Sequence, residues 1–510
     1  MKVLLINPPY TRFKGLVDRY FPIGLGYLAA VLEKAGHTGL IYNVENSAIG
    51  EGEVNWEFIH RLDVFDELLR RQADESNFIY EEIRSVLKNF QPDLIGISNK
   101  TVTFKIAARV AKICKSVFPQ TPIVMGGVHS TACPDEVIFN EFVDFNVIGE
   151  GEETLVELAG ALENKQTDFS NIKGLYFKNS NKEIQKNELR PLIADLDKLP
   201  LPAWHLLLNN HNYSKTLYQS MLGGIFTSRG CPFRCAFCYW EMFGGKVRWR
   251  SPELVVEEIQ LMKKKYGAIE FYFWDDVFTV NKQRLINFCN LLIEKKINIA
   301  WRCHSRADLW DADIIKLVKK AGCYRTSLGI ESGCDETLKY MNKKLNLDTV
   351  KKCAELLNKY NMPWNAAFII GFPEETEEQM LQTFEFIKQI NPGELFLSVF
   401  TPFPGTELYY KTKELGLLEG EIEWEKFETK GPKNAFVLKV SKERFQELHR
   451  TMMKWIDDYN KEANTFWYRL KMRMPYYRKH PVLFARRTYE YLYKMFYNVV
   501  KPKFVHNNFL

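Results

Sequence analysis

The segment Cys231-Pro-Phe-Arg-Cys235-Ala-Phe-Cys238 constrains this chain more than any other stretch. Its three thiols are separated by three residues and then by two, and the next cysteine, Cys289, lies far along the chain. Such a loop can bring three thiolates around one iron–sulfur cluster and leave one iron without a protein ligand. A zinc loop normally has a fourth Cys or His at short range. The spacing therefore predicts a three-cysteine cluster with an open iron.

The overall composition predicts a multidomain cytoplasmic enzyme. The 510 residues suffice for two or three domains, and 46% hydrophobic and 26% charged residues are typical of soluble proteins. A net charge of +6 is too small for this length to indicate a nucleic-acid partner. Ten cysteines indicate reduced thiols rather than a disulfide framework. The apolar start ends at Asn7, too early for a secretory signal, and no apolar run is long enough to span a membrane.

The first 156 residues alternate between strand-like and helix-like segments. We expect strands at 3–6, 38–42, 94–98, 122–125 and 144–148, with helices at 24–35, 81–90 and 104–118. This order predicts a doubly wound (Rossmann-like) parallel sheet, whose ligands bind at the carboxyl ends of the strands. The candidate ligand-binding residues at those ends are Asn7, Pro8, Ser98, Gly126, Gly127, His129, Gly149, Glu150 and Gly151. No Gly-x-Gly-x-x-Gly opens a helix, which argues against a nicotinamide cofactor.

A second alternating pattern begins at Gly224 and follows the proline-containing connector 195–204. Strands are expected at 224–228, 269–274, 299–303, 324–330, 364–371 and 395–401, with helices that begin near Pro252, Lys282, Asp311, Leu347 and Thr376. Six such units predict a partial (β/α)6 barrel with its chemistry at the carboxyl ends of the strands. The cysteine loop follows the first of these strands.

The other strand ends carry the remaining candidates. Asp275 and Asp276 end the second strand, Arg306 the third, Glu331 the fourth and Gly371 the fifth. A carboxylate pair can hold an ammonium group and an arginine can pair a carboxylate. Asp276 could equally cap a turn, and Arg306 could form a surface ion pair.

The cysteine spacing after a short apolar strand resembles the signature of the radical S-adenosylmethionine (SAM) superfamily, and the match covers 221–419. The resemblance implies a [4Fe-4S] cluster whose open iron binds the amino and carboxylate groups of SAM. Phe237 and Tyr239 resemble the aromatic residues usual at this motif. It also implies that Asp275 and Asp276 bind the SAM amino group, that Gly371 packs against adenine, and that Glu331 and Arg306 are candidate catalytic residues.

The N-terminal part resembles the cobalamin (B12)-binding domain found ahead of many radical SAM cores. The matching pieces are LLINPPY, PIGLGYLAAVLEKAGH, PDLIGIS, IVMGGVHST and IGEGEET. The Asp-x-His-x-x-Gly motif, whose histidine binds cobalt from below in many cobalamin domains, is absent. The resemblance therefore implies either a cobalamin with no protein histidine below the cobalt or a domain that has lost the cofactor, with His129 as an alternative ligand.

Together these resemblances imply a cobalamin-dependent radical SAM enzyme that methylates an unactivated carbon or phosphorus of a small-molecule, lipid or natural-product substrate. Such an enzyme needs an electron donor such as flavodoxin or ferredoxin. Two alternatives stay open: a cyclising, ring-contracting or oxidising enzyme without methyl transfer, and an inactive redox-sensing or scaffold protein.

The predicted domains are a cobalamin-binding domain (1–156), a linker with a hairpin (157–212), a radical SAM core (213–425) and a helical C-terminal region (426–510). In the last region Ala485, Tyr489, Leu492, Phe496 and Val499 form one helical face. This face either packs against the rest of the protein or contacts a membrane surface. No nucleic-acid-binding motif accompanies the basic residues of the tail, so no nucleic acid is expected.

Overall fold

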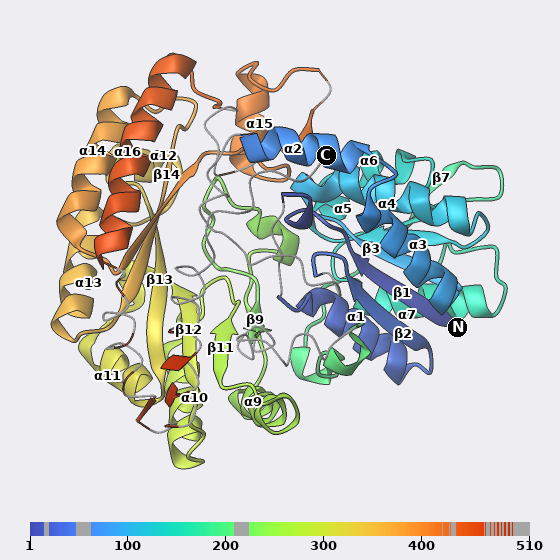
Figure 1. The fold of residues 1–510 in the computed structure, drawn as a ribbon, viewed down its shortest axis with the longest axis horizontal. Coiled ribbons are helices and arrows are strands. Elements are labelled where there is room, and N and C mark those ends of the chain that lie inside the picture. Colours follow the sequence, from blue (N-terminus) through green and yellow to red (C-terminus); the bar gives the residue numbers. More distant parts are fainter. Residues whose placement is uncertain are drawn as a thin grey trace.

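Two sheets, one mainly and one wholly parallel and each flanked by helices, lie side by side in the molecule (Figure 1). The computed structural model describes residues 1–14, 20–46, 63–208, 224–420, 422–427, 429 and 435–463, with scattered positions up to 492. Within these residues no helix has the length and apolar character needed to cross a membrane.

The N-terminal sheet has seven strands in the order β2-β1-β3-β4-β5-β6-β7. The strands are β1 (Lys2–Asn7), β2 (Thr38–Asn43), β3 (Leu94–Ser98), β4 (Ile123–Gly126), β5 (Phe145–Val147), β6 (Leu175–Lys178) and β7 (Ile184–Lys186). The first five are parallel, which confirms the predicted doubly wound sheet. The hairpin that we expected within the linker is β6–β7. It pairs antiparallel with β5 and so extends this sheet instead of standing free.

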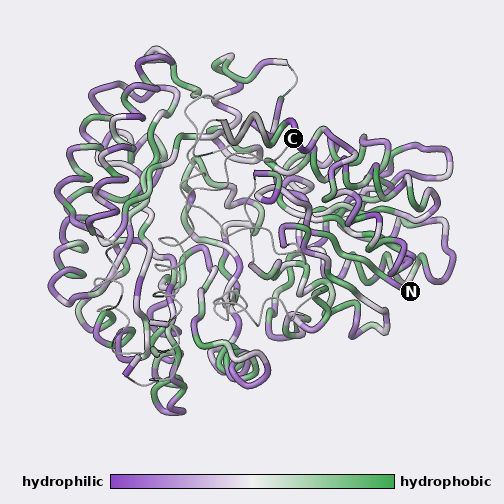
Figure 2. Tube along the Cα trace, in the orientation of Figure 1, coloured by the Kyte–Doolittle hydropathy of each residue, from purple (hydrophilic) through white to green (hydrophobic). Residues whose placement is uncertain are grey.

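Successive side chains of β1 point to opposite faces of this sheet and are buried on both. Val3 and Leu5 belong to one core cluster with α1 (Ile23–Lys34) and α7 (Glu152–Glu163). Leu4 and Ile6 belong to another with α3 (Phe78–Phe90) and α4 (Phe104–Val117). Because both faces are covered, the strands are continuous apolar runs, seen as hydrophobic segments in Figure 2. Three further helices are α2 (Asp63–Ala73), α5 (Val128–Ala132) and α6 (Pro134–Phe139).

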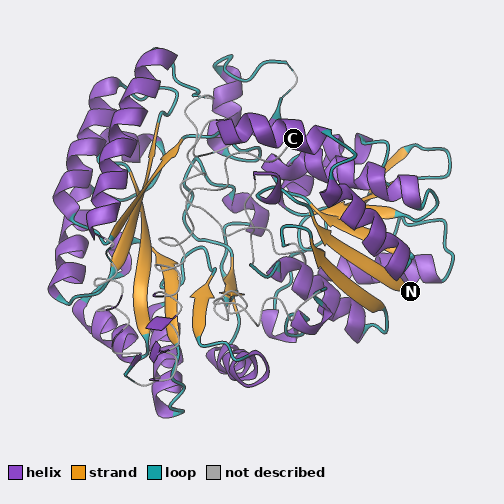
Figure 3. Cartoon of the chain, viewed as in Figure 1, coloured by secondary structure: helices purple, strands orange, loops and turns teal. Residues whose placement is uncertain are grey.

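The second sheet has six strands, all parallel, in the order β15-β14-β13-β12-β11-β8. They are β8 (Gly224–Ile225), β11 (Glu270–Phe273), β12 (Ala300–Ser305), β13 (Cys323–Glu331), β14 (Trp364–Ile370) and β15 (Glu394–Val399). The predicted partial barrel is confirmed (Figure 3). A short antiparallel pair, β9 (Ser228–Arg229) and β10 (Arg248–Trp249), flanks the cysteine loop and was not predicted.

The barrel helices begin where local capping signals predict. The Ser251 hydroxyl accepts the Leu254 N–H ahead of α9, and Asp311 caps α11 in the same way. Thr376 and Gln379 form a capping box at α14. The helices are α9 (Pro252–Tyr266), α10 (Lys282–Glu294), α11 (Ala312–Lys320), α12 (Asp335–Tyr340), α13 (Leu347–Lys359), α14 (Glu377–Ile390), α15 (Glu407–Glu414) and α16 (Lys442–Ala463).

The connector and the C-terminal region both pack on the body of the molecule. The ring of Trp204, at the end of the connector, lies 6.1 Å from those of Phe21 and Tyr266, which places it between the N-terminal domain and α9. Helix α16 packs on β15 beside α14 (Figure 1). Of the apolar face predicted in the tail, Phe496 and Val499 lie outside the described residues, so its role stays a prediction.

Candidate cofactor and active site

The cysteine loop follows β9 and is anchored at its centre. The Ala236 N–H donates to the Met341 carbonyl (2.9 Å), and the Ala236 carbonyl accepts the Leu408 N–H (2.9 Å). Cys235 is buried, Cys231 half-buried and Cys238 exposed. Burial raises the pKa of Cys235, while burial, Asp276 and Cys235 raise that of Cys231. Close thiols that resist ionisation need a cationic partner, and a metal cluster supplies one. The donor set therefore fits an iron–sulfur cluster.

A cavity of about 420 Å³ lies where the two domains meet. From the N-terminal sheet it is lined by strand-end residues that include Ser98, Gly126, Gly127, Gly149, Glu150 and Gly151. From the barrel it is lined by Ser228, Arg229, Met242, Phe243 and Asp276, and α1 contributes Gly24 and Tyr27. Both sets of strand ends therefore face one space, and Asp276 lies close enough to Cys231 and Cys238 to influence their pKa values.

The glycines of this cavity leave bare backbone toward its interior. A Cβ atom built on Gly24 or on Gly149 meets no atom within 4 Å, so these positions border open space. Gly127 has φ +122°, and a Cβ there would lie 2.5 Å from the Asn99 carbonyl oxygen. Only glycine avoids this clash and permits the close turn after β4. A wall of exposed backbone suits a large rigid ligand that approaches closely.

Glu150 lines the cavity, but its carboxylate is already engaged by the barrel. Arg229 Nη1 donates to Glu150 Oε1 (2.7 Å) and Arg248 Nη1 donates to Glu150 Oε2 (2.7 Å). Arg229 also pairs with Glu152. Burial would raise the pKa of Glu150, but hydrogen bonds from Arg248 and Arg229 hold it below its ordinary value. Glu150, predicted as a ligand-binding residue, therefore joins the domains.

Comparison with known families matches both halves of the chain. The model of the radical SAM superfamily matches residues 225–387, and that of the B12 binding domain matches residues 16–159. An uncharacterized methyltransferase of Pyrococcus horikoshii is 32% identical over 439 residues, which cover 85% of this chain and 87% of the relative. This chain belongs to the B12-binding radical SAM family. It is an enzyme of the cobalamin-dependent class, with a [4Fe-4S] cluster, SAM and cobalamin as its cofactors.

Two further relatives and one solved structure are also similar to this chain. An anaerobic magnesium-protoporphyrin IX monomethyl ester cyclase of Rubrivivax gelatinosus is 26% identical and covers 84% of this chain and 72% of its own. A cytidylyl-2-hydroxyethylphosphonate methyltransferase of Streptomyces wedmorensis is 28% identical over a match that covers 82% of this chain and 83% of the relative. The structure of the radical SAM methyltransferase TsrM from Kitasatospora setae superposes on this one with a TM-score of 0.63 at 17% sequence identity. The match covers 81% of this chain and 76% of TsrM and shows that the two share a fold.

The two carboxylates that follow β11 have separate roles. Asp275 is buried and accepts hydrogen bonds from the backbone N–H and hydroxyl groups of Thr227 and Ser228. It therefore holds the start of the barrel in place, and its expected contact with the SAM amino group stays a prediction. Asp276 is exposed and lines the cavity beside the cysteine loop. Asp276 is thus the carboxylate placed to meet a cationic ligand.

Most of the hydrogen-bonding capacity of Arg306 is used within the protein itself. It is 3% exposed, and its Nε and Nη2 donate to the two Asp308 oxygens (3.0 and 3.1 Å). Its Nη1 and Nη2 also donate to the carbonyls of Lys343 and Lys344. Its guanidinium carbon lies 3.7 Å from the ring centroid of Phe233, in the cysteine loop. These contacts are those of a positioning residue, and the expected pairing of Arg306 with a SAM or substrate carboxylate stays a prediction.

Glu331 ends β13 in a left-handed conformation with φ +76°. Its Oε1 accepts a hydrogen bond from Lys343 Nζ at 3.0 Å, and both side chains are largely buried. A Cβ on Gly329 would lie 2.3 Å from Glu331 Oε1, so Gly329 makes room for this side chain. A non-glycine residue with positive φ is held only by strong surroundings and often marks a functional position. Glu331, held by Lys343, therefore remains a candidate residue for contact with SAM or substrate.

The remaining barrel candidates pack against protein groups. Gly371 (φ +83°) faces α16, because a Cβ there would lie 2.7 Å from the Phe445 ring. Phe237 packs near Lys343, whose Nζ is 5.9 Å from its centroid. The ring of Tyr239 lies against Gly405, where a Cβ would meet it at 2.5 Å. These contacts shape the loops around the site.

Three N-terminal candidates lie outside the lining of the cavity. Asn7 donates through its side chain to Asn43 (2.8 Å), and Pro8 is buried. His129 is fully buried between the rings of Phe104 and Trp424. The described residues that line the cavity include no histidine. The expectation of a cobalt without a protein histidine below it stays a prediction.

Sequence reasoning missed several residues that the fold brings to the site. Tyr27 reaches the cavity from the middle of α1, while Met242 and Phe243 come from the turn after the cysteine loop. Lys343 lies in a loop 12 residues after its partner Glu331. None of them follows the end of a predicted strand or belongs to the cysteine motif, so neither strand position nor cysteine spacing points to them.

Proposed function

We propose that this enzyme transfers a methyl group to an unactivated carbon or phosphorus atom of a small-molecule substrate. The observation that carries the proposal is the single cavity lined both by the glycine-rich ends of the N-terminal sheet and by Asp276 beside the cysteine loop. A methyl donor and a radical centre must both reach the same substrate, because reacting atoms approach to about 3–3.5 Å. Two of the relatives described above are named as methyltransferases, which supports this outcome.

Residues of this chain have distinct tasks in the proposed reaction. When bound, the cluster supplies the electron that cleaves SAM, and cobalamin supplies the methyl group. Cys231, Cys235 and Cys238 hold the cluster, and Asp276 binds the SAM ammonium group through a charge-assisted hydrogen bond. Glu331, oriented by Lys343, accepts a hydrogen bond from the ribose of SAM or from the substrate.

The proposal extends to the partners of the enzyme. Cluster reduction needs an external one-electron donor of the flavodoxin or ferredoxin type. All ten cysteines are free thiols, which supports a reducing compartment, the cytoplasm. The substrate is a small molecule that can be lipid-like, and in that case the basic, aromatic C-terminal tail provides contact with a membrane surface.

Isotope transfer tests methylation directly. Anaerobically reconstituted enzyme is incubated with cobalamin, reductant, candidate substrates and SAM that carries a deuterated methyl group, and products are analysed by mass spectrometry. We expect one labelled methyl group per product and 5′-deoxyadenosine beside it. A Cys231→Ala/Cys235→Ala/Cys238→Ala variant should give neither. Labelled product from that variant, or 5′-deoxyadenosine with unlabelled product from the wild type, would contradict the proposal.

A second candidate reaction is cyclisation or oxidation without methyl transfer. It is favoured by the likeness to the cyclase of Rubrivivax gelatinosus, which covers 84% of this chain. The same incubation separates the two reactions. A cyclase forms 5′-deoxyadenosine and a product that has lost hydrogen, with no label from the SAM methyl group.

A further inference from the structure

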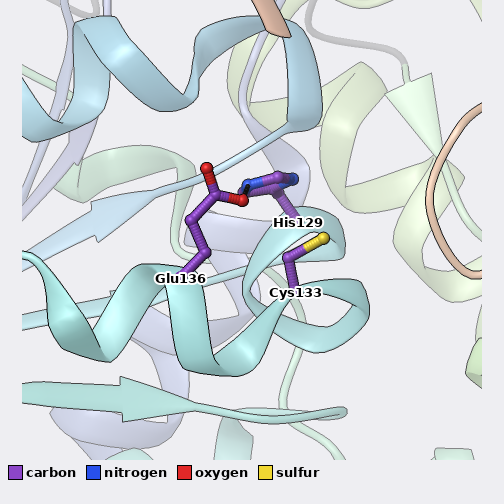
Figure 4. Close-up of side chains that lie close together, drawn as sticks. All are labelled: His129, Cys133 and Glu136. Atoms are coloured by element: carbon purple, nitrogen blue, oxygen red, sulfur yellow. Dashed lines mark ion pairs between the residues drawn. The ribbon is translucent and has the colours of Figure 1, made fainter. Parts of the chain in front are cut away.

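A group of three potential metal ligands lies on the two short helices that follow β4. His129 is on α5, Cys133 joins α5 to α6, and Glu136 is on α6. Their ligand atoms all lie within 4.8 Å of one another. In Figure 4 the Glu136 carboxylate lies against the His129 ring, and the Cys133 side chain lies beside them. The spacing is local, since one helical turn brings residues four apart to the same face.

The histidine of this group lacks the hydrogen bonds that a buried imidazole normally makes. His129 is 0% exposed, and neither of its ring nitrogens has a hydrogen-bond partner among the described residues. Its Nε2 lies 3.4 Å from Glu136 Oε2, within ion-pair distance but without hydrogen-bond geometry. Leaving a buried polar group without a partner destabilises the folded protein. A cation bound by one ring nitrogen would remove part of that destabilisation.

The residues around His129, Cys133 and Glu136 leave one oxygen of the Glu136 carboxylate and one side of the three-residue group open to a metal ion and a water ligand. Trp424 Nε1 donates to Glu136 Oε1 at 2.7 Å, which orients the carboxylate and leaves Oε2 toward His129. Such a hydrogen bond from outside the ligand set is typical of metal sites. A cavity of about 510 Å³, lined in part by Cys133, Glu136, Tyr409 and Trp424, borders the group and has room for a water ligand.

We propose that His129, Cys133 and Glu136 bind a divalent transition-metal ion of the zinc class, with water as the fourth ligand. One nitrogen, one sulfur and one oxygen donor suit Zn²⁺, whereas Mg²⁺ and Ca²⁺ prefer oxygen ligands alone. The ion would link α5 to α6 directly after the Gly126–Gly127 turn that lines the cofactor cavity. This site is separate from the cluster and from the proposed methyl transfer.

Zinc X-ray absorption on the cluster-containing holoenzyme tests the site directly. The protein is equilibrated with Zn²⁺ alone, dialysed against a weak chelator and measured at the zinc edge. We expect about one zinc ion per chain, with one sulfur atom about 2.3 Å from the zinc and nitrogen or oxygen atoms about 2.0–2.1 Å from it. Zinc in place of iron at Cys231, Cys235 and Cys238 would show three sulfur neighbours instead. That result, or zinc that dialyses away completely, would overturn the proposal.

A matched pair of carboxylate variants gives a second test. Glu136→Gln removes a proposed ligand, whereas Asp135→Asn changes its neighbour, whose carboxylate pairs with Lys186. We expect zinc affinity to fall at least tenfold in Glu136→Gln and in Cys133→Ser, and to stay within twofold of wild type in Asp135→Asn. Cobalamin binding, measured in parallel, reports whether each variant is folded. Equal affinities in folded Glu136→Gln and Asp135→Asn would contradict the site.

Discussion

At the scale of single residues, charged side chains near the site mostly hold the protein in shape. Asp275 binds Thr227 and Ser228, Arg306 binds Asp308, and Glu150 binds two arginines. Each is buried, and a buried charge is tolerated only with partners. Asp276 differs, because it is exposed and borders the cavity. A preorganised site thus needs more charged residues for its support than for contact with its ligands.

Arg306 provides the residue-scale prediction. Arg306→Lys loses the two-pronged pair with Asp308 and most contacts to the 343–344 loop and Phe233, and hydrogen bonds to charged groups contribute about 1.5–3 kcal/mol each. We expect at least a tenfold fall in the rate of 5′-deoxyadenosine formation and faster loss of iron from the reconstituted protein. Chromatographic rate assays and iron analysis measure the two effects.

The control for this variant is Arg325→Lys, which weakens an ion pair between Arg325 on β13 and Glu394 on β15, across the intervening strand β14. The melting temperature of the cluster-free protein should fall in both variants and fall less in Arg325→Lys, because the Arg325–Glu394 pair is one partly buried bond whereas Arg306 makes four hydrogen bonds. Only Arg306→Lys should lose iron. Wild-type iron content and rate in Arg306→Lys would show that Arg306 has no positioning role.

At the scale of elements, the loop that joins β14 to α14 is held by a buried carboxyl. Glu375 is 2% exposed, and its Oε2 accepts the N–H groups of Gly371 (2.6 Å) and Phe372 (3.2 Å). Burial raises its pKa to about 8 although these N–H donors lower it. The folded protein therefore holds a proton that the unfolded chain releases near its ordinary pKa of 4.5.

This titration predicts a pH-dependent stability. Between about pH 4.5 and pH 8 only the folded state binds the proton, so its contribution to the free energy of unfolding decreases as pH rises through this window. Glu375→Gln cannot titrate. We expect the melting temperature of Glu375→Gln to rise relative to wild type from pH 5 to pH 8, by an amount equivalent to several kcal/mol at most, since one pKa unit is about 1.4 kcal/mol.

Glu374→Gln is the matched control, because the neighbouring Glu374 is exposed and pairs with Lys411. The side-chain hydrogen bond from Lys411 lowers the pKa of Glu374, so its contribution would be lost only at acid pH. Thermal unfolding at pH 5, 6.5 and 8 compares the three proteins. A pH-independent difference between wild type and Glu375→Gln would contradict a buried, neutral Glu375.

At the scale of the whole molecule, buried ion pairs hold the two domains around their shared cavity. Arg229 joins Glu150 and Glu152, and all three side chains are at most 14% exposed. Its guanidinium carbon also lies 5.4 Å from the ring centroid of Tyr27. The core cluster that contains Trp204 runs from α1 into α9. The orientation of the sheets therefore rests on apolar packing and on a few buried charges.

Removing Arg229 should loosen this arrangement. Arg229→Met leaves Glu152 without its arginine partner and Glu150 paired with Arg248 alone, and breaking a buried pair costs about 3–5 kcal/mol. The matched control is Arg190→Met, since Arg190 pairs with Glu153 and Glu157, whose side chains are 57% and 46% exposed. We expect the control to lose about 1 kcal/mol or less. Urea unfolding measures both losses, and equal losses would contradict a buried ionic link between the domains.

The strands of both sheets except the short β9–β10 pair, the longer helices between them, the barrel and the cysteine loop were predicted from the sequence, because they depend on local patterns. Apolar periodicity locates the strands, and caps such as Ser251 and Thr376 act within three residues of their own positions. The spacing of Cys231, Cys235 and Cys238 is likewise a local property of one loop. Each of these features can be recognised without knowing what lies opposite it.

The partners of the charged residues were decided only by the tertiary structure. Asp275 meets Thr227 across 48 residues, Arg229 meets Glu150 across 79, and Trp424 meets Glu136 across 288. Local sequence shows that Asp275 or Glu150 ends a strand, but not whether the group opposite it is a ligand or another part of the chain. That choice depends on how the two sheets pack against each other, because packing determines which polar groups are buried together and must satisfy one another.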